Sequence, residues 1–313
     1  MTSRPTFSKS SSRFKPRRRP RDLFRSELGK KLIQHRYLTM LRDAPVRCEQ
    51  LRLPTRQGET FVLAAGPAEA PTVVLFHGGG ITSAMWLRSM AVWSATRRVY
   101  AVDIIGEPGL SAPSRPRLIS DAHARWLDDV WRGLSLSTAS VVAASLGGWV
   151  ALDYAIRRPA HVERLALLAP AGIGRQRLGT LYKIMPLLYL GRWGRRKALD
   201  IVMAFDPQEA ASPEGRQLVE LAELVLQHFK FRNRPFPLFK DEQLRRLTMP
   251  VLVVLGGRDA AIDSEQTRRR LASCVPHAEV RYLPEAGHAL TDQTATIAEF
   301  LARRAGGDAT GGD

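Results

Sequence analysis

Three residues along the chain have the types and spacing needed to activate a hydroxyl group for nucleophilic attack. The first, Ser145, follows an apolar run at residues 140–144 and has the small residues Ala143 and Gly147 two positions before and after it. A tight turn from a strand into a helix lifts a serine hydroxyl above the edge of a sheet, and the helix N-terminus favours developing negative charge there. A serine that only caps the following helix would show the same pattern. The motif alone therefore leaves both interpretations open.

Acid and base candidates lie further along the chain, each after an apolar run. Asp259 follows residues 251–255, and His288 follows the last such run, residues 278–283. The chain order of serine, aspartate and histidine is that of one class of serine hydrolase and differs from the order in unrelated ones. Separately, each residue has a plainer interpretation, as a cap or a structural histidine. Together and in this order they favour a catalytic triad, with Asp263 as the alternative acid.

A glycine-rich segment could stabilise the oxyanion that acyl transfer requires. His77 is followed by three glycines, residues 78–80, directly after a buried apolar run. Glycines let backbone amides approach a substrate oxygen without a side chain in the way. We expect one oxyanion donor to be the Gly79 N–H, or that of Gly80 if the loop turns one residue later, and the other to be the Leu146 N–H. His77 is expected to pack under the loop and not to act as a base.

Short apolar runs alternating with helical patterns must position these residues. Expected strands are 46–53, 59–65, 72–76, 99–104, 140–144, 164–168, 251–255 and 278–283, and expected helices are 84–95, 118–133, 147–158, 264–274 and 293–304. Apolar strands joined by helices predict a parallel sheet covered on both faces, and the first two strands predict a hairpin.

The remaining segments divide the chain around this sheet. Residues 1–21 hold eight Lys and Arg and no acidic residue, which predicts a disordered basic arm. Residues 172–240 are helical and aromatic and break the alternation, so we interpret them as an inserted cap. The full predicted division is a basic arm at 1–21, an N-terminal helix at 22–44, the core at 45–171 and 241–304 around a cap at 172–240, and a flexible tail at 305–313.

Other polar and aromatic residues are expected to be structural. Asp103 ends a strand before the nucleophile and is expected to brace a loop, and the histidines without triad context are His35, His123, His161, His228 and His277. The cap begins with cations that we interpret as a solvated helix face, with attraction of an acidic substrate as the alternative: Arg175, Arg177, Lys183, Arg192, Arg195, Arg196 and Lys197. Several large apolar cap residues are expected to pack the cap on the sheet: Tyr182, Leu188, Trp193, Phe205 and Phe229.

With these motifs the chain resembles enzymes of the α/β-hydrolase fold over about residues 45–304, and more narrowly small bacterial carboxylesterases of the naproxen-esterase kind. The narrower resemblance rests on residues 101–113 (AVDIIGEPGLSAP), the turn at Ser145 and residues 232–235 (RNRP). It implies a mostly parallel eight-stranded sheet with helices on both faces, a helical cap inserted before the penultimate strand, and catalytic roles for the three triad candidates. The turn departs from the usual pattern of the family at Ala143 and Ala144, which should slightly reshape the pocket floor.

The predicted function is hydrolysis of a carboxylic ester through an acyl-enzyme on Ser145, with His288 as base and Asp259 as orienting acid. The same triad could instead serve a C–C bond hydrolase, a lactonase or a thioesterase. A serine nucleophile argues against haloalkane dehalogenases and epoxide hydrolases, which resemble this fold but use a carboxylate. A binding protein without activity would normally have lost a member of the triad. No metal or organic cofactor is expected.

Composition and charge set broader limits. The 313 residues carry a net charge of +17, and hydrophobic and charged fractions of 44% and 25% exclude wholesale disorder. The sequence has no 18-residue apolar run, so no transmembrane helix is expected. Two cysteines, Cys48 and Cys274, cannot build a disulfide scaffold or a four-ligand zinc site. We expect a cytoplasmic enzyme for a small ester or related acyl substrate, with no specific nucleic-acid partner; the sequence leaves the oligomeric state open.

Overall fold

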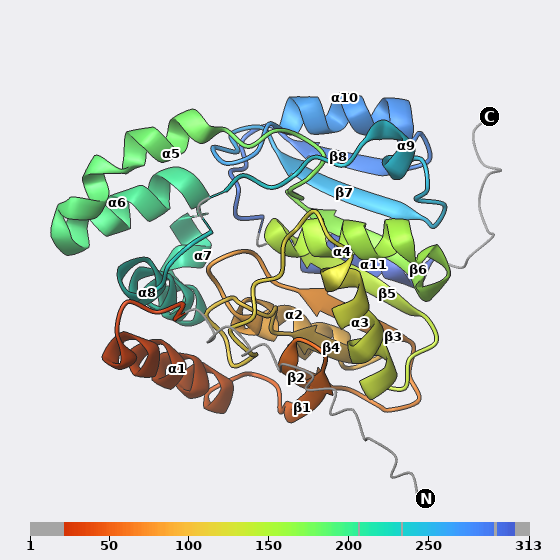
Figure 1. The fold of residues 1–313 in the computed structure, drawn as a ribbon, viewed down its shortest axis with the longest axis horizontal. Helices are drawn as coiled ribbons and strands as arrows, with labels where there is room; N and C mark the ends of the chain where they lie inside the picture. The colour runs from red at the N-terminus through yellow and green to blue at the C-terminus, as the bar shows by residue number, and fades with distance from the viewer. Residues whose placement is uncertain (1–21, 206, 233, 291–292, 304–313) are drawn as a thin grey trace, which may run out of the picture.

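An eight-stranded sheet forms the middle layer of the computed structural model, which describes residues 22–205, 207–232, 234–290 and 293–303 (Figure 1). Its strands are β1 (Glu49–Thr55), β2 (Gly58–Ala65), β3 (Thr72–Phe76), β4 (Arg98–Val102), β5 (Ala139–Ala144), β6 (Val162–Leu168), β7 (Val251–Gly256) and β8 (Glu279–Leu283). Their order in the sheet is β1-β2-β4-β3-β5-β6-β7-β8. From β4 to β8 the neighbours are parallel, whereas β2 is antiparallel to both β1 and β4. The predicted mostly parallel sheet and its initial hairpin are confirmed.

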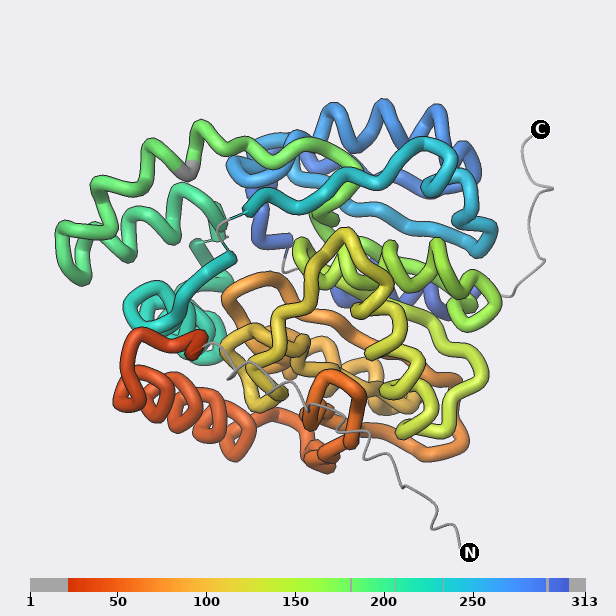
Figure 2. Tube along the Cα trace, viewed as in Figure 1, coloured from red at the N-terminus to blue at the C-terminus, as the bar shows by residue number. Residues whose placement is uncertain are grey.

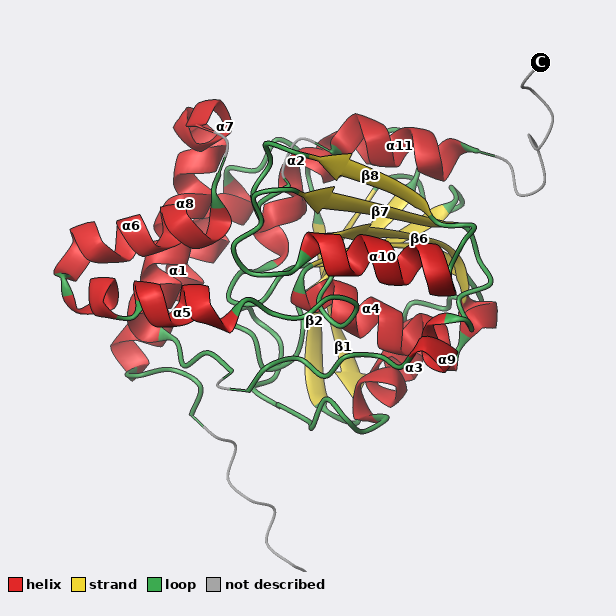
Figure 3. Cartoon of the chain, turned by 90° about the horizontal axis from the view of Figure 1, so that it is seen from above, coloured by secondary structure: helices red, strands yellow, loops and turns green. Residues whose placement is uncertain are grey.

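Helices cover both faces of the sheet (Figures 1 and 3). One face is covered by α3 (Ala122–Gly133), α4 (Leu146–Arg157), α9 (Asp241–Leu244) and α10 (Ser264–Cys274), and the other by η1 (Ser83–Trp86), α2 (Leu87–Trp93) and α11 (Thr294–Ala302). Successive residues of one strand enter opposite cores. Val141 belongs to the same buried cluster as Trp126 and Trp149, and Val142 to the same cluster as Met90 and Phe300. Burial on both faces explains why the strands are apolar throughout.

The parallel register brings the ends of the strands to one edge of the sheet. Phe76 at the end of β3 pairs with Ala143 of β5, one residue before that strand ends. On the other side, Leu168 pairs with Val254 of β7. The glycine loop after β3 and the loops after β5 and β7 therefore lie at the same edge.

Between β6 and β7 the chain leaves the sheet and forms a helical cap to one side of it (Figure 2). The cap contains α5 (Leu178–Ile184), η3 (Pro186–Tyr189), α6 (Gly191–Met203), α7 (Pro207–Ala211) and α8 (Pro213–His228). Its place before the penultimate strand is the one that the resemblance implied. Among the described residues, none of the helices is both long and apolar enough to span a membrane.

The N-terminal helix α1 (Glu27–Arg42) packs along α8 of the cap (Figure 1). Arg36 forms an ion pair with Glu220 at 2.5 Å, and the Lys230 N–H donates to the carbonyl of Leu23. The prediction that this helix begins at residue 22 was wrong. The helix begins at Glu27, because the Ser26 hydroxyl accepts the Gly29 N–H and caps its first turn.

The expectation that the large cap side chains pack on the sheet is wrong for two of them. Tyr182 and Trp193 are 74% and 67% exposed, whereas Phe229 is fully buried. Tyr182 lies on α5 and Trp193 on α6. These two helices lie beside the sheet and not over it (Figures 1 and 3). Phe229 follows α8, where it pairs with Phe24 before α1. The predicted arm and tail at 1–21 and 305–313 lie outside the described residues.

Candidate active site

Ser145 occupies the turn between β5 and α4 in a backbone conformation that residues with side chains rarely adopt. Its φ and ψ angles are 50° and −113°, and its N–H donates to the carbonyl of Leu168. Two residues later, a Cβ on Gly147 would lie 2.5 Å from the carbonyl oxygen of Phe76. The small residue at this position is therefore required by the close approach of α4 to β3.

His288 lies between Ser145 and Asp259 and is within hydrogen-bond distance of both. Its Nε2 is 3.0 Å from Ser145 Oγ, and its Nδ1 is 2.8 Å from Asp259 Oδ2. The side chains of His288 and Asp259 are 8% and 1% exposed. A neutral imidazole that donates from Nδ1 to the carboxylate presents Nε2 as an acceptor to the serine hydroxyl. The structure thus brings together the three residues that the sequence singled out.

The loops after β7 and β8 are joined by backbone contacts that hold Asp259 and His288 in place. The Gly257 N–H donates to the carbonyl of Leu283, and the Arg258 N–H donates to that of Ala286. Oxygen Oδ1 of Asp259 accepts the N–H groups of Ala261 and Ile262 at 2.7 and 2.9 Å. The carboxylate is therefore oriented from one side by its own loop and faces the imidazole on the other.

Asp263, the alternative acid, does not contact His288. Its Oδ1 accepts the Gln266 N–H at 2.9 Å and caps the first turn of α10. This is a common structural role for an aspartate just before a helix. The geometry favours Asp259 over Asp263 as the partner of the histidine.

The glycine loop places Gly79 next to Leu146. A Cβ built on Gly79 would lie 3.5 Å from Leu146 Cβ, so the two residues whose amides were expected to bind an oxyanion are neighbours. The Gly80 N–H, in contrast, donates to Glu107 Oε2 at 2.9 Å. This amide already has an acceptor, which leaves Gly79 as the better candidate of the two.

His77 and Asp103 brace this loop from below. His77 is buried, with Nδ1 2.7 Å from the carbonyl of Gly78 and Nε2 accepting the Ile104 N–H at 2.9 Å. Asp103 Oδ1 accepts from the Tyr37 hydroxyl and the Ser83 N–H. Both nitrogens of His77 are occupied, so it packs under the loop as predicted and is not a base. Asp103 has the bracing role that was predicted.

Sequence reasoning missed Glu107, which connects the glycine loop to the cap. Glu107 is almost fully buried; one carboxylate oxygen accepts the Gly80 N–H, and the other lies 3.3 Å from Arg232 Nε. Both residues stand in stretches that carried the family resemblance, residues 101–113 and 232–235. Their pairing depends on the tertiary structure, and no local pattern indicates it.

His123 is buried on α3 and is uncharged at neutral pH. Burial, and secondarily the charge of Arg232, lower its pKa from 6.5 to about 3. Its ring meets that of Trp149 edge-on at 5.8 Å between centroids. Within the described part of the chain, neither ring nitrogen has a hydrogen-bond partner. His123 is therefore a packing residue, as expected.

Comparisons with known proteins agree with the class of enzyme that this fold and site define. Residues 73–300 match the model of the alpha/beta hydrolase family, and the chain belongs to that family. It is 32% identical to carboxylesterase YbfK of Bacillus subtilis, over 79% of this chain and 84% of the relative. The crystal structure of naproxen esterase from Bacillus subtilis superposes with a TM-score of 0.73 at 31% identity, covering 85% of this chain and 94% of that one.

A further relative carries the name of a different reaction. The chain is 29% identical to 2-hydroxymuconate semialdehyde hydrolase of Pseudomonas putida, over 84% of this chain and 88% of the relative. The carboxylesterases and this hydrolase share hydrolysis as their chemistry. The protein is a hydrolase of the alpha/beta family.

Proposed function

We propose that the protein hydrolyses carboxylic esters of small molecules through an acyl-enzyme intermediate on Ser145. The observation that carries this proposal is the hydrogen-bonded chain from Ser145 Oγ through His288 to Asp259. Support also comes from relatives named carboxylesterases that match most of this chain. The cytoplasmic location expected from the sequence stays a prediction.

The proposed acylation step follows from the positions of the three side chains. Ser145 Oγ attacks the ester carbonyl while His288 Nε2 accepts the hydroxyl proton, and Asp259 Oδ2 stabilises the imidazolium through its bond to Nδ1. The negative charge that develops on the carbonyl oxygen is held by the amides of Gly79 and Leu146. His288 then donates its proton to the alcohol oxygen, the C–O bond breaks, and the acyl group stays on Ser145.

Deacylation repeats these roles with water as the nucleophile. His288 accepts a proton from water, the resulting hydroxide attacks the acyl carbonyl, and the same two amides hold the oxyanion. Collapse of the tetrahedral intermediate returns the proton from His288 to Ser145 Oγ and releases the acid. Each proton transfer in this scheme is assigned to a side chain of the site.

Cleavage of a carbon–carbon bond is the second candidate, and the relative named 2-hydroxymuconate semialdehyde hydrolase favours it. The same nucleophile, base and oxyanion amides would serve, but the leaving group would be a carbon acid instead of an alcohol. A lactone or thioester would likewise be attacked by the same groups. The substrate, and not the triad, separates these alternatives.

The test combines a covalent label with a substrate panel. A fluorophosphonate probe should label the wild-type chain and fail to label Ser145→Ala, while the exposed-serine control Ser273→Ala is labelled normally. p-Nitrophenyl esters of increasing chain length should be hydrolysed, and Ser145→Ala should lose this activity by several orders of magnitude. Full activity of purified Ser145→Ala would overturn the nucleophile assignment. Turnover of a vinylogous diketone without ester cleavage would favour the carbon–carbon hydrolase.

A further inference from the structure

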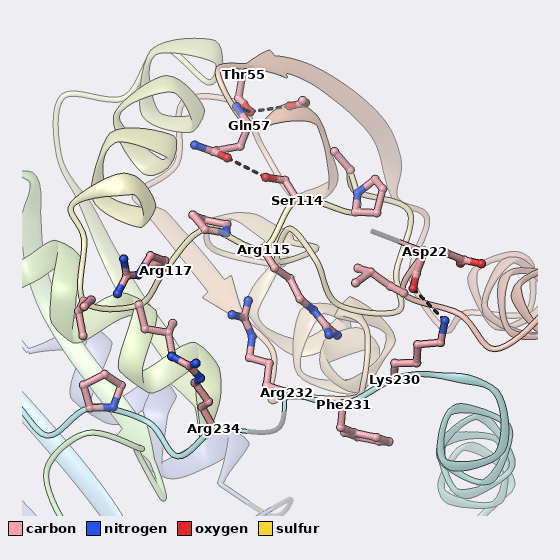
Figure 4. A pocket seen from close by; sticks show the side chains of 18 of the residues that line it. Asp22, Thr55, Gln57, Ser114, Arg115, Arg117, Lys230, Phe231, Arg232 and Arg234 are labelled. Carbon is pink, nitrogen blue, oxygen red and sulfur yellow. Dashed lines mark hydrogen bonds between the residues drawn. The ribbon is translucent and has the colours of Figure 1, made fainter. Parts of the chain in front are cut away.

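A groove of about 1590 Å³ opens on the side of the molecule where the cap meets the hairpin (Figure 4). Its walls are the β1–β2 turn, the loop at residues 112–119 and the segments 230–232 and 234–237. None of the three triad candidates lines it. The groove therefore does not include the triad, but it adjoins the glycine loop through Arg232, the partner of Glu107. Its volume exceeds the roughly 300–1,000 Å³ of common small-molecule sites.

Positive charge dominates the lining. Six cationic side chains line the groove: Arg56, Arg115, Arg117, Lys230, Arg232 and Arg234. Asp22 is the one acidic residue among its described lining residues. Arg56 and Arg232 have carboxylate partners in Asp129 and Glu107. For the other four cations, no carboxylate of the described chain lies within ion-pair distance, so the groove holds uncompensated positive charge.

Two of these guanidinium groups are fixed and still have unused donors. Arg115 lies over the ring of Phe229 at 4.9 Å and donates from Nε to the carbonyl of Gly106 at 2.8 Å. The Nη2 atoms of Arg115 and Arg232 are buried and have no hydrogen-bond partner among the described residues. Figure 4 shows the two side chains next to each other. A buried N–H donor without an acceptor lowers the stability of the fold, because it has lost its hydrogen bonds to water. A surface arginine keeps those hydrogen bonds.

The two guanidinium groups lie close together and share a single carboxylate, that of Glu107, so one positive charge of the pair is left unbalanced. Burial lowers the pKa of Arg115; Glu107 partly offsets this, and the neighbouring charge of Arg232 lowers the pKa further. An anion with several oxygens in the groove could accept from both guanidinium groups and balance the charge that Glu107 leaves. Planar guanidinium groups match the oxygens of phosphate in paired hydrogen bonds.

We propose that this groove binds the phosphate group of a small phosphorylated molecule or lipid headgroup. Arg115 and Arg232 supply one pair of donors, and the exposed Arg117, Lys230 and Arg234 line the rest of the groove. More than one uncompensated charge favours a dianionic phosphate over a single carboxylate. The volume leaves room for an organic group attached to the phosphate.

Isothermal titration calorimetry on the full chain at low salt tests the proposal, with inorganic pyrophosphate as the probe. The wild type should bind one equivalent, and Arg115→Gln should weaken binding by roughly tenfold or more, because each lost bond is to a charged group. The double variant R117Q/R234Q changes exposed residues and keeps the test valid if Arg115→Gln fails to fold. It should also weaken binding by roughly tenfold.

The double variant R245Q/R246Q is the matched control, since it removes two exposed charges that do not line the groove. It should bind pyrophosphate within twofold of the wild type. If R245Q/R246Q and R117Q/R234Q lose pyrophosphate affinity equally, the effect is one of overall charge and the proposal is overturned. The proposal is also overturned if the wild type does not bind pyrophosphate. Titration with glycerol 3-phosphate and sedimentation with vesicles containing phosphatidic acid then distinguish a soluble ligand from a lipid headgroup.

Discussion

At the scale of single residues, Asp259 has two oxygens with different partners. One faces His288 at 2.8 Å and the other accepts two backbone N–H groups of its own loop. In Asp259→Asn the amide can no longer stabilise an imidazolium, and it favours the wrong histidine tautomer. We expect kcat to fall on the order of 10⁴-fold, the loss seen for the same substitution in a well-studied triad.

Asp263→Asn is the matched control for this substitution, because asparagine also caps helices well. Its kcat on a p-nitrophenyl ester should stay close to that of the wild type. Steady-state kinetics of the two purified variants provide the comparison. A large loss in Asp263→Asn with little loss in Asp259→Asn would transfer the role of the acid to Asp263.

Glu107 is a positioning residue in our proposed mechanism, since it acts on the glycine loop and not on the substrate. The Glu107 carboxylate accepts the Gly80 N–H and pairs with Arg232, and Glu107→Gln removes its negative charge. We expect kcat to fall about tenfold with little change in KM. A tenfold loss corresponds to about 1.4 kcal/mol in barrier height, which is less than the ~2.7–4 kcal/mol that losing an oxyanion donor costs. Glu59→Gln, which removes an exposed ion pair with Arg52 on the hairpin, is the control. Equal kcat values for the two variants would contradict the role of Glu107.

The candidate site illustrates what a sequence can predict at this scale. Ser145, Asp259 and His288 could be found because each follows an apolar strand, and parallel strands end at one edge of the sheet. Glu107 and Arg232 could not be found in this way, because their ion pair joins a core loop to the end of the cap. Nothing in the local sequence of either residue specifies that contact.

At the scale of elements, α3 and α4 pack together around a buried histidine. The pKa of His123 is lowered from 6.5 to about 3, so the unfolded chain binds a proton near pH 6.5 while the folded chain does not. The free energy of unfolding should therefore be insensitive to His123 above pH 6.5. As the pH falls from 6.5 toward 3, this residue reduces stability by about 1.4 kcal/mol per pH unit.

The variant His123→Phe keeps an aromatic ring against Trp149 and removes the titrating group. Between pH 6.5 and pH 5 the wild type should lose about 2 kcal/mol more stability than His123→Phe. Urea denaturation at several pH values measures the difference. The control His35→Gln, which removes an exposed histidine, should follow the wild type. Parallel curves for the wild type and His123→Phe would refute the buried neutral state.

The elements themselves were largely predictable, and their packing partners were less so. Runs such as 72–76 and 264–274 coincide with β3 and α10, because apolar periodicity and a capping aspartate mark their limits. The packing of α1 on α8 could not be predicted, since the apolar face of a helix does not specify which other helix covers it. The exposed Tyr182 and Trp193 were wrongly placed because the sequence does not show which helix faces remain uncovered.

At the scale of the whole molecule, charge is distributed unevenly along the chain. Residues 1–21 contribute eight positive charges to a net charge of +17. Exposed charges interact over only about 8 Å at physiological ionic strength, and a neutral ester is not steered by the net charge. Deleting residues 1–21 should therefore leave kcat/KM on a neutral ester unchanged within about twofold, or ~0.4 kcal/mol in barrier height.

The deletion variant should also bind less strongly to anionic lipid or nucleic acid at low salt. The deleted segment has eight positive charges and no negative one, so the deletion lowers the net positive charge. Kinetics and vesicle sedimentation of the full chain and the deletion variant provide both measurements. A tenfold loss of activity on deletion would show that this segment packs on the catalytic core.

The backbone of Ser145 has a consequence for how this chain can evolve. A positive φ at a residue with a side chain costs on the order of 1–3 kcal/mol, and glycine avoids most of this cost. Within a random library, chains that replace Ser145 with glycine would therefore be among the more heat-resistant. A selection for thermostability alone would enrich inactive enzymes at this position, so only a screen that also rewards turnover would retain the serine.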